Sequence, residues 1–394
     1  MNAFPLATAA PAAHGIREDQ LQRLDALIER HIADGHYPGC QIALARRGRL
    51  LLEKTFGHAR TAPETVAAQD DTLWLLYSNT KVIVASVLWQ LAEQGAFRFS
   101  DRLAAHVPEF SHHGKGDITI LQIITHQGGF PGAQISREGM HDSHAMKASV
   151  CAFPLEWPPG SRVQYHGLSA HWALALLIET VTGRNFRDHV RDSVIEPLGL
   201  ANDLFVGLPP AQDARVSDMH EPLPGAAVPP AASTVSVSEA RREFRPLAES
   251  NGESWRRAGS PGGGGYGTAR GMVALYQMML AGGALGDARI VSPRMLDYAI
   301  RNHTGDRIDE YMGMPMHRGL GPHLRGATEN IRGLGAIASP RTFGHGGVGS
   351  SYCWADPESG VSFAYLTNNR SPDPWHTERL DLVSNLVHAA ILPD

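Results

Sequence analysis

The stretch Tyr77-Ser78-Asn79-Thr80-Lys81 opens a long apolar helical run. A helix places residues that are three apart on one face, so the Ser78 hydroxyl and the Lys81 amine are predicted to lie side by side. Serine attacks acyl groups only when a base takes its proton and donors stabilise the oxyanion. Lys81 and the unpaired N–H groups of the helix N-terminus provide the types of group that these two tasks need. Because so short a pattern arises easily by chance, its meaning depends on the rest of the chain.

The composition is that of an ordinary globular protein. Hydrophobic residues make up 43% and charged residues 19% of the 394 residues, which allows a substantial core. This length exceeds what one core usually organises, so we expect two lobes or one domain with an insertion. The formal net charge of -5 leaves no basic excess for nucleic acid, which we therefore exclude as a partner.

The sequence predicts a cytoplasmic protein. Residues Met1–Ala7 lack the basic segment of a secretory signal, and no apolar run reaches transmembrane length, so we expect no membrane partner. The cysteines Cys40, Cys151 and Cys353 are odd in number and lack metal-ligand spacing. We therefore expect buried free thiols, a reducing compartment and no metal site.

Hydrophobic periodicity places strands at both ends of the chain and helices in the middle. Strands are predicted at 40–44, 50–56, 344–350, 352–355 and 361–366, and helices at 17–33, 82–92, 170–182, 185–194, 269–280 and 377–390. The economical fold is α/β of the α+β type, with an antiparallel sheet flanked by terminal helices and an inserted, mostly helical lobe.

The expected domains are 15–77 plus 285–394 for the sheet and 78–284 for the helices, with the active site at their junction. Residues 209–236, rich in Pro, Ala and Ser, are predicted to form a long loop that borders a site. The run Gly262–Gly265 precedes a helix but lacks the Lys-Ser/Thr of a phosphate-binding loop. We interpret it as a backbone crossing too close for side chains.

Two distant fragments extend the serine–lysine pair: Tyr165 after the turn Trp157-Pro158-Pro159-Gly160, and His345-Gly346-Gly347 at the start of a C-terminal strand. In order and approximate spacing, the three fragments resemble the serine β-lactamase-like hydrolases, in the branch of class C β-lactamases, DD-peptidases and family VIII carboxylesterases. The resemblance runs from about Leu21 to the end of the chain. It implies the β-lactamase/transpeptidase-like fold as well as the site.

The resemblance implies that Ser78 is the acyl-accepting nucleophile. Lys81 and Tyr165 would share the proton transfers, and either one is a candidate for the base. In this family two backbone N–H groups form the oxyanion hole, and here they would belong to Ser78 and Val348. The resemblance implies no metal or organic cofactor.

Two departures from the family patterns bear on the substrate. The family's Tyr-x-Asn reads Tyr165-His166-Gly167 here, and the Lys-Thr-Gly of many lactamases reads His345-Gly346-Gly347. An amide that grips the substrate and a lysine that attracts its carboxylate are both replaced, and histidine is mostly neutral at pH 7. The predicted substrate-binding residues are His166, Gly167, His345, Gly346 and Gly347.

We therefore expect a serine hydrolase that cleaves small-molecule esters through an acyl-enzyme intermediate, as family VIII carboxylesterases do. The alternatives left open are a β-lactamase, a D-amino-acid peptidase or amidase, an acyltransferase, and a catalytically silent binding protein on the same scaffold. The sequence leaves the oligomeric state open.

Overall fold

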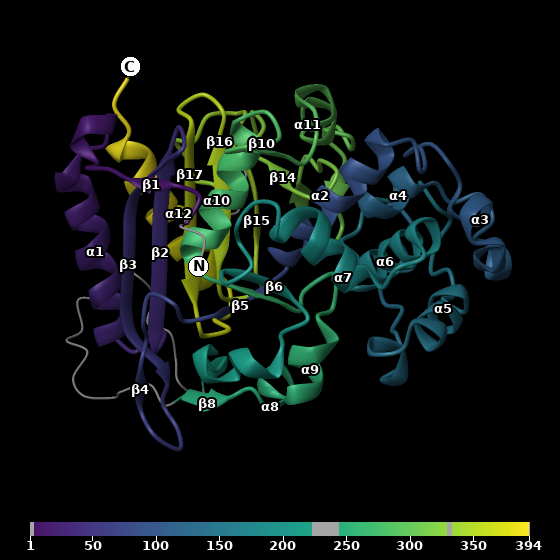
Figure 1. The fold of residues 1–394 in the computed structure, drawn as a ribbon, viewed down its shortest axis with the longest axis horizontal. Helices are drawn as coiled ribbons and strands as arrows, with labels where there is room; N and C mark the ends of the chain where they lie inside the picture. Colours follow the sequence, from purple (N-terminus) through teal and green to yellow (C-terminus); the bar gives the residue numbers. More distant parts are fainter. Residues whose placement is uncertain (1–3, 223–243, 329–332, 394) are drawn as a thin grey trace.

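A layered sheet and a mostly helical region lie side by side in the molecule (Figure 1). The computed structural model describes residues 4–222, 244–328 and 333–393. Within these residues the main sheet has eight strands, in the order β1-β3-β2-β17-β16-β15-β14, with β4 beside β3. The strands are β1 (Ala7–Thr8), β2 (Gly39–Arg46), β3 (Arg49–Arg60), β4 (Val66–Ala67), β14 (His323–Leu324), β15 (Phe343–Gly346), β16 (Tyr352–Asp356) and β17 (Val361–Thr367).

Both ends of the chain build the centre of this sheet. β2 and β3 form a hairpin whose turn residues Arg47 and Gly48 have φ angles of 48° and 77°, as a two-residue turn requires. β2 also pairs antiparallel with β17, so Cys40 lies opposite Thr367. The predicted fold class, an antiparallel sheet with flanking terminal helices and an inserted helical lobe, is confirmed.

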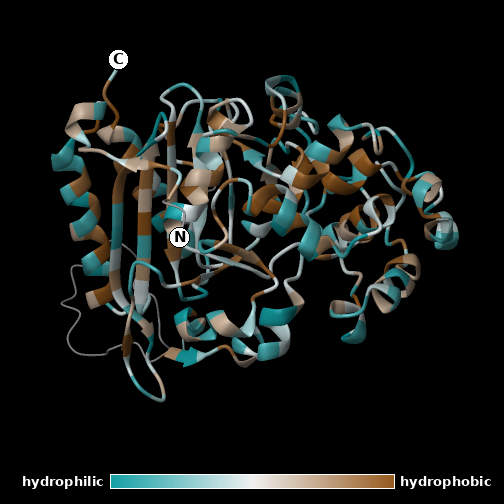
Figure 2. Cartoon of the chain, in the orientation of Figure 1, coloured by the Kyte–Doolittle hydropathy of each residue, from teal (hydrophilic) through white to brown (hydrophobic). Residues whose placement is uncertain are grey.

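The central strands present large side chains to one face of the sheet and small ones to the other. On β2, Ile42 and Leu44 pack in the core that α1 and α12 share, whereas Ala43 and Ala45 face the core that contains α10. The small residues allow α10 to lie close to the sheet. On the other face, the hydrophilic side of α1 is turned outward (Figure 2). The three helices are α1 (Glu18–Ala33), α10 (Ala269–Leu280) and α12 (Trp375–Ala390).

The helical region surrounds α2, in which every side chain from Thr80 to Trp89 is buried. This confirms the predicted helix between two layers. Thr119 caps α4 through a capping box with Gln122, and Gly183 ends α6 with a φ of 66°. The helices are α2 (Thr80–Glu93), α3 (Leu103–His106), α4 (Ile120–Ile124), α5 (Ser143–Cys151), α6 (Ser169–Thr182) and α7 (Phe186–Val190), which continues into a π-helical turn (Arg191–Ile195).

A small sheet of β5 (Trp74–Tyr77), β9 (Gly265–Gly267) and β6 (Leu204–Val206) connects the two regions. The glycine run enters β9 where side chains have no room. A Cβ atom at Gly264 would lie 2.3 Å from the Ser260 nitrogen, and one at Gly265 would lie 2.7 Å from the Thr80 hydroxyl. The predicted close backbone crossing is therefore confirmed.

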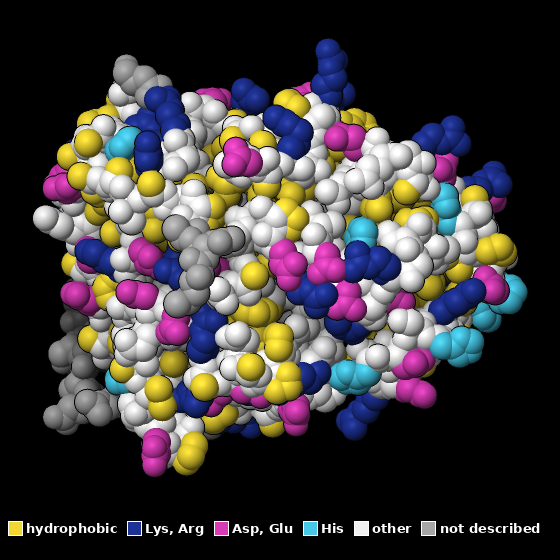
Figure 3. All heavy atoms as spheres, viewed as in Figure 1, with side chains coloured by type: hydrophobic (Ala, Val, Ile, Leu, Met, Phe, Trp, Pro, Cys, Tyr) yellow, Lys and Arg dark blue, Asp and Glu magenta, His cyan; other side chains and the backbone are white. Residues whose placement is uncertain are grey.

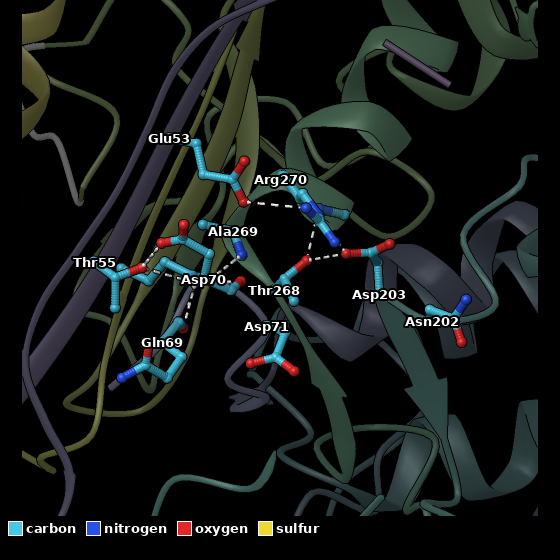
Figure 4. Close-up of polar contacts among 12 residues, drawn as sticks. Glu53, Thr55, Gln69, Asp70, Asp71, Asn202, Asp203, Thr268, Ala269 and Arg270 are labelled. Carbon is cyan, nitrogen blue, oxygen red and sulfur yellow. Dashed lines mark hydrogen bonds and ion pairs between the residues drawn. The ribbon is translucent and has the colours of Figure 1, made fainter. Parts of the chain in front are cut away.

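The division into 15–77 plus 285–394 and 78–284 stays a prediction. α10 falls in the second range but packs on β2 and β17 of the sheet. At its start, Arg270 lies 2.7 Å from Asp203 of the helical region and 3.7 Å from Glu53 of β3 (Figure 4). These ion pairs join the helical region to the sheet.

Shorter elements complete the fold. They are α8 (Ala248–Asn251), α9 (Glu253–Ala258), α11 (Pro293–Ala299) and the strand pairs β7 (His220–Pro222) with β8 (Phe244–Pro246), β10 (Ala284–Leu285) with β11 (Ala288–Arg289), and β12 (Ile308–Asp309) with β13 (Met314–Pro315). Of the predicted loop 209–236, Pro210–Arg215 forms a 3-10 helix and His220–Pro222 a strand, whereas 223–236 lie outside the described residues.

The surface shown in Figure 3 carries basic and acidic side chains interspersed, without a large patch of one sign. In the part of the chain that is described, no helix combines the length and the apolar character needed to cross a membrane. The cysteines Cys40, Cys151 and Cys353 are buried and free, as predicted.

Candidate active site

Ser78 sits in the tight connection between β5 and α2, at the junction of the two regions. The preceding Tyr77 has a φ of 43°, an uncommon conformation for a bulky residue that is typical of functional sites. The Thr80 hydroxyl donates to the Tyr77 carbonyl at 2.6 Å and accepts from the Gly265 N–H at 2.9 Å. These two bonds lock the turn that presents Ser78.

Lys81 lies one helical turn beyond Ser78, with its Nζ atom 3.2 Å from the Ser78 Oγ atom. The amine also donates to the carbonyl of Gly167 at 2.7 Å and to that of Gly262. Burial, together with the positive charge of Arg318, holds the pKa of Lys81 well below its ordinary range. A neutral amine has two hydrogens, and once these are used on the two carbonyls its lone pair is left for the serine proton.

Tyr165 approaches Ser78 from the other side, and its hydroxyl donates to the Ser78 Oγ atom at 2.8 Å. Burial raises the pKa of Tyr165 to about 12, although the bond to Ser78 and the nearby Arg318 oppose this rise. The phenol therefore keeps its proton near neutral pH and serves as a donor. The predicted residues Ser78, Lys81 and Tyr165, from two segments far apart in the sequence, thus lie together.

The turn between β15 and β16 places Val348 beside Ser78, and both residues line the same two cavities. Within the described part of the chain, the backbone N–H groups of Ser78 and Val348 donate no hydrogen bond to protein atoms. Arg379 of α12 fixes this turn by donating to the carbonyls of Gly349 at 3.0 Å and Ser350 at 2.7 Å. Two unused backbone donors beside the same cavities are the type of group from which an oxyanion hole is built.

His345 lies at the end of β15 with its imidazole buried. Its Nδ1 atom is 2.9 Å from the Gly346 carbonyl, and its Nε2 atom has no hydrogen-bond partner among the described residues. Burial holds the pKa of His345 well below 6.5, so the ring is neutral and, with Nδ1–H donating, Nε2 is an acceptor. Gly346 and Gly347 have no room for side chains, since a Cβ atom would lie 2.7 Å from the Tyr352 ring or 2.6 Å from the Ser351 hydroxyl.

The expectation that His166 binds substrate does not fit its placement. Its side chain is buried, with Nε2 accepting from the Phe130 N–H at 3.0 Å and Nδ1 lying 2.7 Å from the Gln164 carbonyl. These contacts give His166 a structural role in holding the segment that carries Tyr165. Gly167, by contrast, lines a cavity beside Ser78, and its carbonyl holds Lys81.

A buried ion pair lies behind Tyr165 and was not predicted from the sequence. Arg318 is 1% exposed, Asp309 is fully buried, and the Arg318 Nε atom donates to Asp309 at 3.0 Å. The guanidinium carbon is 5.0 Å from the centre of the Tyr165 ring. Both residues lie in irregular sequence near two-residue strands, where neither periodicity nor a motif marks them.

Two cavities meet at Ser78, and Tyr165, Tyr311 and Val348 line both. The β15-side cavity, of about 150 Å³, reaches past His345 to α12, and the loop-side cavity, of about 480 Å³, reaches past Gly167 and Trp255. No lysine or arginine is among the described residues that line either one. A third cavity, of about 600 Å³ near α7 and β6, is lined by none of the site residues.

The described ranges contain no group of three or more histidine, cysteine or acidic side chains that could hold a metal ion. Lys81 and Tyr165 bring a buried amine and a phenol within hydrogen-bond distance of the Ser78 hydroxyl.

The family model described as Beta-lactamase matches residues 24–387. This chain belongs to the β-lactamase family. The membership agrees with the motif resemblance found in the sequence, and it identifies the protein as a serine hydrolase of that family.

Related β-lactamase-family proteins include enzymes with different names. A penicillin-binding protein homologue from Caulobacter crescentus superimposes with a TM-score of 0.79 at 26% identity, covering 96% of this chain and 99% of that one. The crystal structure of a family VIII carboxylesterase gives 0.76 at 27% identity, with coverage of 96% and 99%. Esterase/beta-lactamase LipL of Mycobacterium tuberculosis is 28% identical over 320 residues, 77% of this chain and 71% of LipL.

Proposed function

We propose that this β-lactamase-family hydrolase is a carboxylesterase for small, uncharged esters and that it acts through an acyl-enzyme at Ser78. The observation that carries the proposal is the environment of Lys81. Its amine is buried, donates to two backbone carbonyls and faces the Ser78 Oγ atom at 3.2 Å. Since burial favours the neutral amine, Lys81 is the general base and Tyr165 the proton donor.

In the acylation step, the Ser78 Oγ atom attacks the ester carbonyl carbon while its proton passes to Lys81. The carbonyl oxygen becomes an oxyanion and accepts from the N–H groups of Ser78 and Val348. The bond to the alcohol oxygen then breaks, and this oxygen takes the proton of Tyr165. The ammonium of Lys81 returns a proton to the tyrosinate, so both groups recover their starting forms.

In the deacylation step, water attacks the acyl carbon and gives its proton to the neutral Lys81 amine. The same two N–H groups stabilise the second oxyanion. The bond to Ser78 Oγ breaks, the serine regains a proton from the Lys81–Tyr165 pair, and the carboxylic acid leaves. These steps need no metal or organic cofactor.

The lining of the two cavities supports an uncharged substrate. Among the described residues it contains no lysine or arginine, and His345 is neutral, so neither a lysine, an arginine nor His345 offers a positive charge to a substrate carboxylate there. β-Lactams and D-alanyl peptides carry such a carboxylate. The name of the family VIII carboxylesterase also supports this choice, whereas the name of LipL includes both esterase and β-lactamase activity.

The test compares the wild type with Ser78→Ala on a short-chain p-nitrophenyl ester, nitrocefin and a D-alanyl peptide. We expect ester turnover by the wild type alone, with weak or no turnover of the other two substrates. A fluorophosphonate probe should add its mass to Ser78 in the wild type and not in the variant. Ester turnover that survives in folded Ser78→Ala would refute the nucleophile, and preferred turnover of nitrocefin would refute the substrate class.

The same experiment separates the remaining alternatives. An added alcohol acceptor that diverts the acyl group quantitatively would identify an acyltransferase, and a wild type without an adduct would identify a silent binding protein. We also propose a cytoplasmic location, because the buried free thiols of Cys40, Cys151 and Cys353 suit a reducing compartment.

A further inference from the structure

Arg318 is a buried cation close to the reacting groups but outside the cavities. It lines neither the β15-side nor the loop-side cavity, so it has no route to the substrate. Its guanidinium pairs with Asp309 and stacks at 5.0 Å from the Tyr165 ring, and its Nη1 atom has no partner among the described residues. A buried charge is costly, so its place behind the proton donor needs an explanation.

Asp309 connects this cation to the backbone of the site. One of its oxygens accepts from the N–H groups of Tyr165 at 3.2 Å, Tyr311 at 3.1 Å and Met312 at 3.2 Å, while the other accepts from Arg318. Asp309 also bridges Val163, two residues before Tyr165. A single carboxylate therefore fixes both the tyrosine segment and the turn whose Tyr311 stands between the two cavities.

The charges that act on Tyr165 and Lys81 are few. The Lys81 Nζ atom lies 5.0 Å from the Tyr165 ring centre, on which Arg318 also packs. The surrounding imidazoles have pKa values that burial depresses below 6.5, and they are therefore neutral near pH 7. These are His126, His166, His171 and His345. Lys81 and Arg318 lie against the Tyr165 ring and Asp309 pairs with Arg318, so these three groups bring charge closest to the phenol.

We propose that Arg318 and Asp309 are a positioning pair, which holds Tyr165 at Ser78 and sets the charge balance in which Lys81 and Tyr165 exchange protons. The inference rests on the proposed roles of Lys81 and Tyr165. The Arg318 cation opposes a second positive charge on Lys81 and favours negative charge on the Tyr165 oxygen. Asp309 limits both effects and supplies the backbone anchor.

The two members of the pair have opposite charges, so their removal has opposite effects on the pH dependence. Activity requires neutral Lys81, and the acid limb of kcat/KM reports its titration. R318M removes a cation, so Lys81 keeps its proton to higher pH and the acid limb of the profile shifts to higher pH. D309N leaves the Arg318 cation without its counter-charge, so Lys81 loses its proton at lower pH and the acid limb shifts to lower pH.

The size of the shift follows from the geometry. Lys81 Nζ and the Arg318 guanidinium carbon lie no more than about 10 Å apart, since each is 5.0 Å from the same ring centre. At an effective dielectric of about 20, one charge at that distance moves a titration by roughly one pH unit. The expected displacement is therefore about one pH unit upward in R318M and a comparable one downward in D309N.

The experiment measures kcat/KM of a p-nitrophenyl ester against pH for the wild type, R318M, R318Q, R318K and D309N, with circular dichroism as a check of folding. R318K keeps the positive charge, so its acid limb should lie at the same pH as that of the wild type. R318Q removes the charge but keeps a hydrogen-bond donor to Asp309. It replaces R318M in the comparison if R318M does not fold.

If the acid limbs of the variants lie at the wild-type pH while kcat falls equally at every pH, the pair does not act on Lys81 through its charge. Shifts of the R318M and D309N limbs in the same direction would also contradict this role. Wild-type ester turnover and labelling of Ser78, measured first, test the proposed function separately. An inactive wild type contradicts that function, whereas an active one with unmoved limbs contradicts this inference alone.

Discussion

Tyr165→Phe removes one hydroxyl, the donor that lies 2.8 Å from the Ser78 Oγ atom. In the wild type the pKa of Tyr165 is raised to about 12 by burial, so at pH 8 only about one phenol in 10⁴ is ionised. A tyrosinate base would therefore be scarce, which favours the proposed role of the phenol as a proton donor. Loss of a general acid lowers the rate by about 10²–10⁴, which corresponds to about 3–5 kcal/mol of activation free energy.

The assay is the pH profile of kcat/KM for a p-nitrophenyl ester between pH 7 and 10, for the wild type and Tyr165→Phe. We expect a wild-type profile without a steady rise over this range, because neutral Lys81 is the base. The variant should lose 10²–10⁴ in kcat while keeping the melting temperature within a few degrees, since the aromatic ring is retained.

Two results would refute this reasoning. A wild-type kcat/KM that increases tenfold with each pH unit from 7 to 10 would mean that the base is mostly protonated over this range, which contradicts a neutral Lys81 as the base. A Tyr165→Phe variant with wild-type kcat would mean that the hydroxyl transfers no proton in the slow step. A general structural effect would instead lower the melting temperature along with the rate.

Three further predictions concern the framework of the site. Arg379→Met releases the turn that carries Val348, so kcat should fall by up to about 10² at similar KM, and an unchanged kcat would remove Arg379 from the oxyanion argument. Arg270→Ala leaves Asp203 buried with one hydroxyl partner, so urea unfolding should show a loss of about 2–3 kcal/mol with kcat unaffected. The buried imidazole of His166 has a pKa lowered to about 4, so it stays neutral in the folded protein at a pH where it would be protonated in the unfolded chain. Its contribution to the free energy of unfolding is therefore complete above pH 6.5. As the pH falls towards 4, this contribution is lost at about 1.4 kcal/mol per pH unit. Urea midpoints at pH 7 and pH 5 test this, and a His166→Gln variant should show the smaller change.

The framework of the fold could be predicted because its signals are local. The hairpin of β2 and β3 follows from alternation around a glycine turn, and α2 follows from an unbroken apolar run. The β5-β9-β6 sheet was not predicted, since strands of three or four residues are too short for a period of two to show. Its glycine-rich strand β9 could be interpreted only as a close backbone crossing.

The candidate site divides in the same way. Ser78, Lys81 and Tyr165 stand in motifs with fixed spacing, whereas Asp309 and Arg318 meet through tertiary contacts between irregular segments. His166 was assigned to the substrate because it follows Tyr165, but the backbone turns its ring into the core, where Phe130 and Gln164 occupy both nitrogens. Adjacency in sequence thus did not predict the direction of a side chain.

The positions of His345 and Arg318 together explain how a hydrolase of this family can keep its proton chemistry without binding a carboxylate. At the strand position where many lactamases have lysine, a neutral His345 lines the β15-side cavity. The cation nearest to the phenol is Arg318, which is buried behind Tyr165 and outside both cavities. Its field acts on Lys81 and Tyr165 at short range through a medium of low dielectric, whereas neither lysine nor arginine is among the described residues that line the two cavities. If the proposed roles hold, a positive charge behind the tyrosine and not on the cavity wall separates proton transfer from substrate selection, which is the arrangement that the proposed preference for neutral esters requires.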